Sequence, residues 1–369
     1  MKISLTGTRG IPNRYGGFEQ FAEQLSVRLA ERGHEVWVYN PVDHPCRDNT
    51  FHKVNIIRKH LHEKLLGPAA NYLYDWTCLG DAVSMKSDII LECGYASAAP
   101  VFRFIDFKNS KIITHLDGME WQRPKWSQLT RKIIKRAEKT TIRLSHALVC
   151  DHPYIGSYFE ETYGVKPWFI PYGADILKDP DSRMIEKYNV SPNEYYLVIA
   201  RLEPENSLHT IIGGFLKPGC KEKLVIVGDI DTAFGRKLYN KSGTSKNIIF
   251  LDGIYDQNIL NNLRYFSKAY FHGHSVGGTN PSLLEAMAAG SLIIAHDNQF
   301  NRFVLKDNAF YFNTEDDIRS FIGSFRDLSG RKEEMIRNNI RTIEENYRWE
   351  DITGRYEELF RSCISGGIG

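Results

Sequence analysis

The feature that most constrains the fold is a repeated alternation of short apolar strands, glycine-bearing loops and helices. The chain starts with an apolar strand at residues 2–6, a loop that contains Gly7 and Gly10, a helix and a second strand at residues 35–39. In the helix, Phe18, Phe21 and Leu25 recur at helical spacing. This strand–helix–strand unit begins a parallel sheet. Further strands are expected at residues 54–58, 88–93, 111–115, 147–150 and 168–170, with helices at 60–82 and 126–145.

A second alternation follows a segment rich in proline and glycine at residues 171–192, which is typical of an interdomain linker. Its strands are expected at residues 196–200, 224–227, 247–251, 269–271, 292–295 and 309–312. We therefore predict an α/β protein with two Rossmann-like, doubly wound domains, residues 1–170 and 171–345, that face a cleft. Residues 346–369 form a helical segment, with Trp349, Ile352 and Tyr356 on one side, that is expected to cross back to the first domain.

Composition excludes several classes of protein. A formal net charge of +2 over 369 residues argues against a general nucleic-acid-binding protein. The six cysteines are scattered without a close pair, so neither a disulfide framework nor a zinc site is predicted. No signal-peptide pattern begins the chain, and no apolar run approaches the roughly 18 residues of a membrane span. We expect a cytoplasmic protein that could still bind the inner surface of the plasma membrane.

Residues 269–290 predict an anion site. A short strand leads into Gly277 and Gly278, after which Asn280 can cap a helix whose first turn begins at Pro281. Such a helix start presents unpaired N–H groups and a positive dipole end, which suit a phosphate. Glu285 lies just over one turn into the helix, where it can accept hydrogen bonds from ribose hydroxyls. The alternative is a capped strand–loop–helix turn with a solvated glutamate.

Other polar residues follow the strands of both domains, where ligands of open α/β sheets bind. Arg201 follows the first strand of the second domain and can give charge and two-pronged hydrogen bonds to a diphosphate. In the first domain, Asp117 follows the strand at 111–115 and is a candidate for chemistry, or else caps the next helix. The DxD triplet at residues 229–231 is interpreted as a structural turn, and no metal site is predicted.

A basic segment follows Asp117. The helix at residues 126–145 carries six basic side chains against a single acid, Glu138, and Trp121, Arg123 and Trp126 lie at or before its start. Basic residues beside tryptophans suit an anionic membrane surface. A solvated basic face is the alternative.

Several of these segments together resemble the retaining glycosyltransferases of the GT-B fold, in glycosyltransferase family 4. They are Tyr-Gly-Gly-Phe-Glu at 15–19, Ile-Pro-Tyr-Gly-Ala-Asp at 170–175, Arg-Leu-Glu-Pro-Glu at 201–205, Val-Gly-Asp at 227–229 and Pro-Ser-Leu-Leu-Glu-Ala-Met-Ala-Ala-Gly at 281–290. Two positions depart from the pattern. The family often has glutamate where this chain has Gly277, and it usually has lysine where this chain has Asn206.

The segments Gly-Thr-Arg-Gly-Ile-Pro at 7–12, Asp-Gly-Met-Glu-Trp at 117–121 and Gly-Gly-Thr-Asn-Pro at 277–281 resemble a narrower bacterial group. Its members include rhamnosyltransferases that use dTDP-L-rhamnose to build capsule, O-antigen or cell-wall rhamnan. The resemblance implies transfer of L-rhamnose, with retention, onto a saccharide acceptor that is expected to be lipid-linked. It implies no cofactor and no metal. Another nucleotide-sugar donor, a GT-B epimerase or phosphorylase, and a non-catalytic nucleotide-sugar-binding protein remain as alternatives.

The resemblance and the residues together give three sets of site candidates. The catalytic candidates are Asp117, Arg201 and Glu205. The acceptor-binding candidates are Arg14, Tyr15, Gly16, Gly17 and Arg123, where the two glycines allow close approach of the backbone. The donor-binding candidates are Arg201, Glu203, Asn206, Gly277, Gly278, Thr279, Asn280, Pro281, Ser282 and Glu285.

Overall fold

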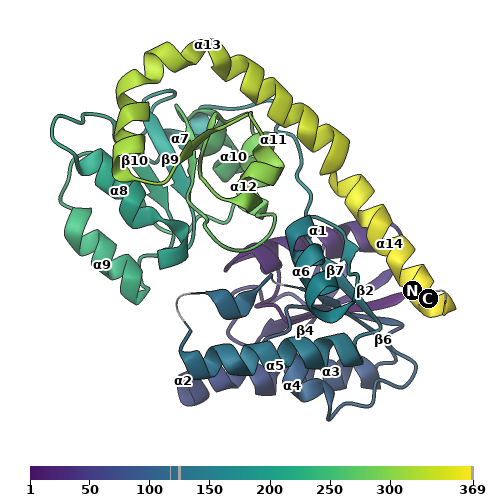
Figure 1. The fold of residues 1–369 in the computed structure, drawn as a ribbon. Coiled ribbons are helices and arrows are strands. Elements are labelled where there is room, and N and C mark those ends of the chain that lie inside the picture. The colour runs from purple at the N-terminus through teal and green to yellow at the C-terminus, as the bar shows by residue number, and fades with distance from the viewer. Residues whose placement is uncertain (117, 124–125, 367–369) are drawn as a thin grey trace. The chain divides into compact units, whose positions relative to one another are not determined.

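The computed structural model describes residues 1–116, 118–123 and 126–366, which form two compact units. Unit 1 comprises Met1–Tyr172 and Trp349–Gly369, and unit 2 comprises Gly173–Arg348. The chain passes into unit 2 once and returns to unit 1 with its last helix (Figure 1). Within the described residues, no helix is long and apolar enough to cross a bilayer.

Unit 1 is built on an eight-stranded sheet in the order β3-β4-β2-β1-β5-β6-β7-β8. Neighbouring strands are parallel except for the antiparallel pair β3 and β4. The strands are β1 (Lys2–Thr6), β2 (Glu35–Pro41), β3 (Thr50–Phe51), β4 (Val54–Lys59), β5 (Ile89–Cys93), β6 (Lys111–His115), β7 (Ala147–Cys150) and β8 (Trp168–Phe169).

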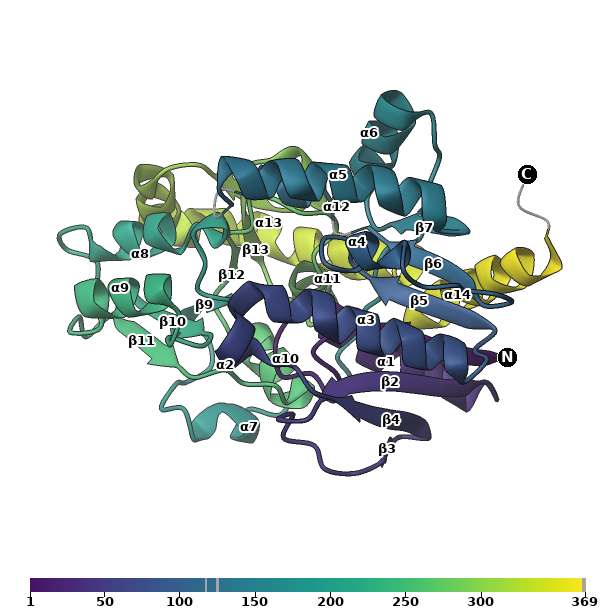
Figure 2. The same cartoon turned by 90° about the horizontal axis from the view of Figure 1, so that it is seen from below.

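Helices cover both faces of this sheet, and the residues on both sides of its central strands are buried. On one face α1 packs against α14, where the rings of Phe21 and Tyr356 lie 5.5 Å apart. On the other face lie α3, α4 and α5 (Figures 1 and 2), and α3 and α4 share a core with Ile90 and Ile112. The helices are α1 (Gly17–Glu31), α2 (Glu63–Leu66), α3 (Ala70–Ser84), α4 (Ala98–Phe102), α5 (Gln128–Leu144), α6 (Pro153–Tyr163) and α14 (Trp349–Ser365).

The structure corrects one expected element. Residues 60–82 do not form a single helix, because a 3-10 turn at Gly67–Ala69 separates α2 from α3. Gly67 has φ of 54°, in the left-handed region that glycine adopts most readily. Pro68 follows it, and a proline disfavours helical conformation in the residue before it. The periodic pattern of apolar residues continues through this break and so does not reveal it.

Unit 2 is built on a six-stranded parallel sheet in the order β11-β10-β9-β12-β13-β14. The strand order reverses between β9 and β12, and ligands of such sheets bind beyond the carboxyl ends of the strands at this switch point. The prediction of two doubly wound α/β units is confirmed. The strands are β9 (Tyr195–Ile199), β10 (Lys223–Val227), β11 (Ile248–Leu251), β12 (Tyr270–His272), β13 (Ile293–His296) and β14 (Phe310–Phe312).

The helices of unit 2 connect these strands and cover the sheet around one apolar cluster that includes Tyr196, Phe215 and Phe271. The longest is α13, which has 32 residues and was not predicted; it begins with a capping box made by Thr314 and Asp317. The helices are α7 (Arg183–Glu186), α8 (Leu208–Leu216), α9 (Ala233–Ser242), α10 (Gln257–Tyr265), α11 (Pro281–Ala288), α12 (Gln299–Leu305) and α13 (Glu315–Asn346).

Candidate functional site

The loops that follow β9 and β12 touch at the switch point of unit 2. Ser275 donates hydrogen bonds from its backbone N–H and its hydroxyl to the carbonyl oxygen of Glu205, at 3.0 and 2.8 Å. A Cβ atom on Gly273 would lie 2.1 Å from the carbonyl oxygen of Asn206, so only glycine fits there. The side-chain amide of Asn206 donates to the carbonyl oxygen of Arg201 at 2.7 Å. Residues 201–206 and 273–275 therefore form one braced surface.

The start of α11 has the features of an anion site. Asn280 caps the helix, since its Oδ1 accepts from the N–H of Ser282 at 3.0 Å, and Pro281 occupies the first turn. Gly277 has φ of 117°, a conformation that favours glycine. Within the described residues, the N–H groups of Gly277, Gly278 and Asn280 donate no hydrogen bond to the protein. They are available to an anion at the positive end of the helix dipole.

Ser282 is placed differently from its neighbours. Its N–H is used by the helix cap, and its hydroxyl is hydrogen-bonded to the hydroxyl of Tyr270 at 2.5 Å and to the carbonyl oxygen of Ile199 at 3.3 Å. Ser282 thus anchors the first turn of α11 to strands β9 and β12. For Ser282 to contact a donor, as predicted, one of these hydrogen bonds within the protein would have to be replaced by a hydrogen bond to the donor.

Glu285 is partly buried and paired with a buried arginine. The guanidinium of Arg264, whose side chain is 1% exposed, donates to Oε2 of Glu285 at 2.6 Å. A second guanidinium nitrogen donates to Oδ1 of Asn261 at 2.9 Å. Arg264 lies in the last turn of α10, 21 residues before Glu285, so no local sequence pattern linked the two residues.

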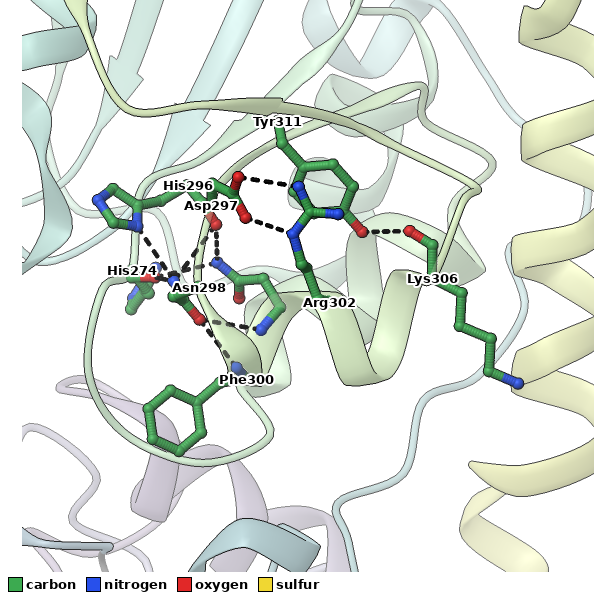
Figure 3. Close-up of polar contacts among 9 residues, drawn as sticks. His274, His296, Asp297, Asn298, Phe300, Arg302, Lys306 and Tyr311 are labelled. Carbon is green, nitrogen blue, oxygen red and sulfur yellow. Dashed lines mark hydrogen bonds and ion pairs between the residues drawn. The ribbon is translucent and has the colours of Figure 1, made fainter.

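Two asparagines, Asn298 before α12 and Asn301 within it, are hydrogen-bonded to the loop after β12. Figure 3 shows Asn298 beside His274 and His296. The side-chain amide of Asn298 donates to the carbonyl oxygen of His274 at 3.0 Å, and that of Asn301 donates to the same oxygen at 3.1 Å and to the carbonyl oxygen of His296 at 2.8 Å. Asn298 also caps α12. These bonds brace the chain where it enters the glycine loop, and the sequence analysis missed them.

A histidine cluster lies beside this brace. The rings of His272 and His274 are stacked with centroids 4.4 Å apart. Burial lowers the pKa of His272 well below its usual value, because the charged form would be removed from water. His272 is therefore neutral at physiological pH. The signal that could have found this cluster is its position, since His272 and His296 each end a parallel strand.

The remaining residues after β9 and β10 are placed as follows. Arg201 is exposed at the carboxyl end of β9, Glu203 is half-buried, and the side chain of Glu205 is buried. In the DxD triplet, Oδ1 of Asp229 accepts from the N–H of Asp231 at 2.8 Å and closes a turn. The described residues contain no cluster of histidine, cysteine, aspartate and glutamate that could hold a metal ion.

In unit 1, Asp117 lies outside the described residues, but the residues around it are well anchored. The hydroxyl of Tyr95 lies 3.2 Å from the carbonyl oxygen of Gly118 and 3.1 Å from Oε1 of Glu138. Arg123, a predicted acceptor residue, forms an ion pair with the buried Glu120. These contacts hold both ends of the short described segment 118–123.

The loop after β1 contains the other acceptor candidates. The guanidinium of Arg9 lies over the ring of Tyr15, 5.3 Å from the ring centroid. Gly16 precedes the first turn of α1. The structure also places two buried carboxyls, Asp75 and Glu92, behind this loop. Burial raises the pKa of Asp75 to about 7 and that of Glu92 well above its usual value. No local sequence pattern singles out these two carboxyls.

Two protein-family models match the chain. Residues 1–175 match the family described as domain of unknown function (DUF1972), and residues 182–345 match the family described as glycosyl transferases group 1. No curated protein sequence matches the chain.

Solved structures with a similar fold cover nearly the whole chain. Sucrose-phosphate synthase from Thermosynechococcus elongatus aligns with a TM-score of 0.80 at 15% identity over 99% of each chain. Anabaena HepE in complex with UDP-glucose aligns with a TM-score of 0.77 at 15% identity, over 98% of this chain and 99% of that chain. The catalytic domain of starch synthase IV from Arabidopsis thaliana, bound to ADP and acarbose, aligns with a TM-score of 0.73 at 14% identity over 99% of each chain.

The family match and the fold agree on the general class of the protein. The matched residues 182–345 include the glycine loop, α11 and the Arg264–Glu285 pair of unit 2. At these identities the solved structures show the fold alone, and that fold has two Rossmann-like units. Residues 182–345 therefore match a glycosyl transferases group 1 domain, and the chain has the GT-B fold.

Proposed function

We propose that the protein transfers L-rhamnose from dTDP-L-rhamnose, with retention, onto a lipid-linked saccharide acceptor in the synthesis of a bacterial surface polysaccharide. The group 1 domain supports transfer of a sugar from a nucleotide. The choice of rhamnose rests on the sequence resemblance of residues 7–12, 117–121 and 277–281 to rhamnosyltransferases. The observation that carries the donor site is the set of N–H groups at the start of α11, which the protein itself leaves unbonded within its described residues.

Unit 2 would bind the donor and stabilise the leaving group. The N–H groups of Gly277, Gly278 and Asn280 would bind the diphosphate, and the exposed Arg201 would add positive charge. Negative charge grows on the diphosphate as the glycosidic bond breaks, so donors placed there act most strongly in the transition state. Glu285 would accept hydrogen bonds from the sugar of the nucleoside. No metal ion or cofactor takes part in the proposed reaction.

Unit 1 would bind the acceptor. Gly16 and Gly17 allow close approach of the backbone, and Arg14, Tyr15 and Arg123 offer polar and aromatic contacts. Asp117 would orient the acceptor hydroxyl or take its proton. In the proposed retaining reaction, the acceptor oxygen attacks the anomeric carbon on the face from which the diphosphate leaves. The new carbon–oxygen bond forms as the bond to the diphosphate breaks, and a diphosphate oxygen helps to take the proton.

The outer face of α5 supports docking to an anionic membrane. Lys132, Arg136, Lys139 and Arg143 are exposed along it, and in the described part of the chain none of them forms an ion pair. Leu129 is 70% and Ile133 is 40% exposed at the start of the same helix. The single acid of α5, Glu138, is buried on the opposite face. Exposed apolar side chains beside a basic stripe fit a surface of anionic lipids.

An assay of donor use tests the proposed function. The purified protein is incubated with membranes that contain lipid-linked saccharide and with dTDP-L-rhamnose, UDP-glucose or a GDP-sugar. We expect transfer from dTDP-L-rhamnose, a product whose anomeric configuration by NMR matches that of the donor, and loss of transfer in Asp117→Asn with donor binding retained. Transfer only from a UDP- or GDP-sugar would contradict the proposed donor. Donor binding without transfer to any acceptor would favour a non-catalytic binding protein.

A further inference from the structure

We propose that Arg264 restricts the Glu285 carboxylate to a single ligand hydroxyl, and that it thereby makes the nucleoside site suited to 2′-deoxyribose. This inference rests on the proposed function, because it concerns the nucleoside of the donor that Glu285 would bind. It assigns a specificity-determining role to a residue that would not itself contact the ligand. No local sequence pattern marks that residue.

Arg264 is fixed from several directions. Its guanidinium donates to Oε2 of Glu285 at 2.6 Å and to Oδ1 of Asn261 at 2.9 Å. Its carbonyl oxygen accepts from the hydroxyls of Ser267 and Ser291, at 2.7 and 2.9 Å. The side chain is 1% exposed. A buried guanidinium held in this way does not move aside when a ligand arrives, because leaving Glu285 would expose an unpaired buried charge.

The carboxylate of Glu285 is asymmetric as a result. Within the described residues, Arg264 is the one side chain that hydrogen-bonds to it, and the bond engages Oε2. Within the described residues Oε1 accepts no hydrogen bond, and the Glu285 side chain keeps 13% of its surface exposed. Because Glu285 lies on α11 only a few residues after the N–H groups at its start, a nucleoside whose diphosphate binds those groups would bring its sugar near Oε1.

This asymmetry discriminates between two kinds of nucleoside. A ribose presents neighbouring 2′ and 3′ hydroxyls, which together can occupy both oxygens of a carboxylate. A 2′-deoxyribose presents the 3′ hydroxyl alone. With Oε2 already bonded to Arg264, a hydroxyl that reaches this oxygen must share it with the guanidinium, so a second hydroxyl adds less binding free energy than the first. A carboxylate with both oxygens free would instead bind the ribonucleotide more tightly than the matching 2′-deoxyribonucleotide.

Matched ligand pairs test this without altering the protein. Calorimetric titration of the full chain compares thymidine diphosphate with ribothymidine diphosphate, and dUDP with UDP, so that each pair differs by the 2′ hydroxyl alone. We expect dissociation constants within about threefold inside each pair, because a hydrogen bond to a charged group would otherwise change affinity by about tenfold or more. We also expect 3′-deoxythymidine diphosphate to bind at least about tenfold more weakly than thymidine diphosphate. Preference for both ribonucleotides by about tenfold or more would overturn the inference.

A variant tests the role of Arg264 directly. Arg264→Gln should free Oε2 and shift the ratio of affinities toward the ribonucleotide by about fivefold or more. The matched control is Arg341→Gln, which breaks the exposed Arg341–Glu345 pair of 2.7 Å on α13 and should leave the ratio unchanged. A folded Arg264→Gln variant with an unchanged ratio would refute the assignment, and if that variant fails to fold, the ligand pairs decide. Absence of binding by all of these nucleotides would contradict the proposed donor site itself, whereas tight binding with ribonucleotide preference would overturn the role of Arg264 alone.

Discussion

Gly273 lies where the loops after β9 and β12 are in contact, and the space between them does not admit a methyl group. A Cβ atom there would lie 2.1 Å from the carbonyl oxygen of Asn206, and a backbone atom cannot move aside cheaply. We expect Gly273→Ala to lower the free energy of unfolding by about 1–3 kcal/mol, as overpacking does. Urea denaturation measures this. The control is Gly323→Ala in α13, where nothing lies within 4 Å and alanine should stabilise by about 0.5–1 kcal/mol. Equal stability of Gly273→Ala and the wild type would show that the loops do not touch as described.

The buried carboxyls of unit 1 give the protein a pH-dependent stability. Burial raises the pKa of Asp75 to about 7, while an unfolded aspartate titrates near pH 4. Between these values the folded chain holds a proton that the unfolded chain has released, so the free energy of unfolding falls as pH rises. This carboxyl contributes a slope of at most about 1.4 kcal/mol per pH unit. Asp75→Asn should flatten the slope between pH 5 and about 7 in urea denaturation. An unchanged slope in the variant would remove Asp75 as its source.

Local patterns predicted the residues of the site that act within one turn or loop. Asn280 and Pro281 are recognisable because a cap and a first-turn proline are separated by fixed, short spacings. Arg264, Asn298 and Asn301 were missed because each acts on a loop that tertiary folding brings to it. Whether the predicted residues bind donor or acceptor remains a prediction, and for Asp117 the position lies outside the described residues.

At the scale of elements, α5 presents a basic stripe outward and buries its acid inward. Reversing two of these charges, with Lys132→Glu and Arg136→Glu together, should abolish co-sedimentation with vesicles that contain anionic lipid, since each basic residue near such a surface contributes about 1 kcal/mol. The matched control reverses Arg337 and Arg341, which are exposed on α13 in unit 2. Wild-type protein that stays in solution with anionic vesicles at low salt would support a plain solvated face instead.

The strands were the elements easiest to predict, because a buried parallel strand is a continuous apolar run between loops. Helices were harder. Apolar periodicity continued through Gly67 and Pro68, where the chain leaves the helix between α2 and α3. The 32-residue α13 was missed because its mostly polar sequence is stabilised by packing one side on unit 2, which periodicity alone did not show.

The molecule consists of two similar units, and different functional groups lie at the edges of their sheets. Unit 2 presents open N–H groups, an exposed arginine and a partly open carboxylate, which together suit a nucleoside diphosphate. Unit 1 presents a glycine loop backed by buried carboxyls and the anchored segment 118–123. The two αβ series were predictable from the sequence because each unit repeats the same strand and helix spacing. The nature of the acceptor was not predictable, because no local pattern encodes the shape of a saccharide site.

The proposed function depends on binding of the donor's diphosphate at the start of α11. Hydrogen–deuterium exchange of the full chain, with and without saturating thymidine diphosphate, tests it most directly. We expect the ligand to slow exchange in peptides that span residues 273–285, and we expect no comparable change in α13, which has no proposed contact with the nucleotide. Slowed exchange elsewhere, with residues 277–280 unchanged under saturating ligand, would contradict the account.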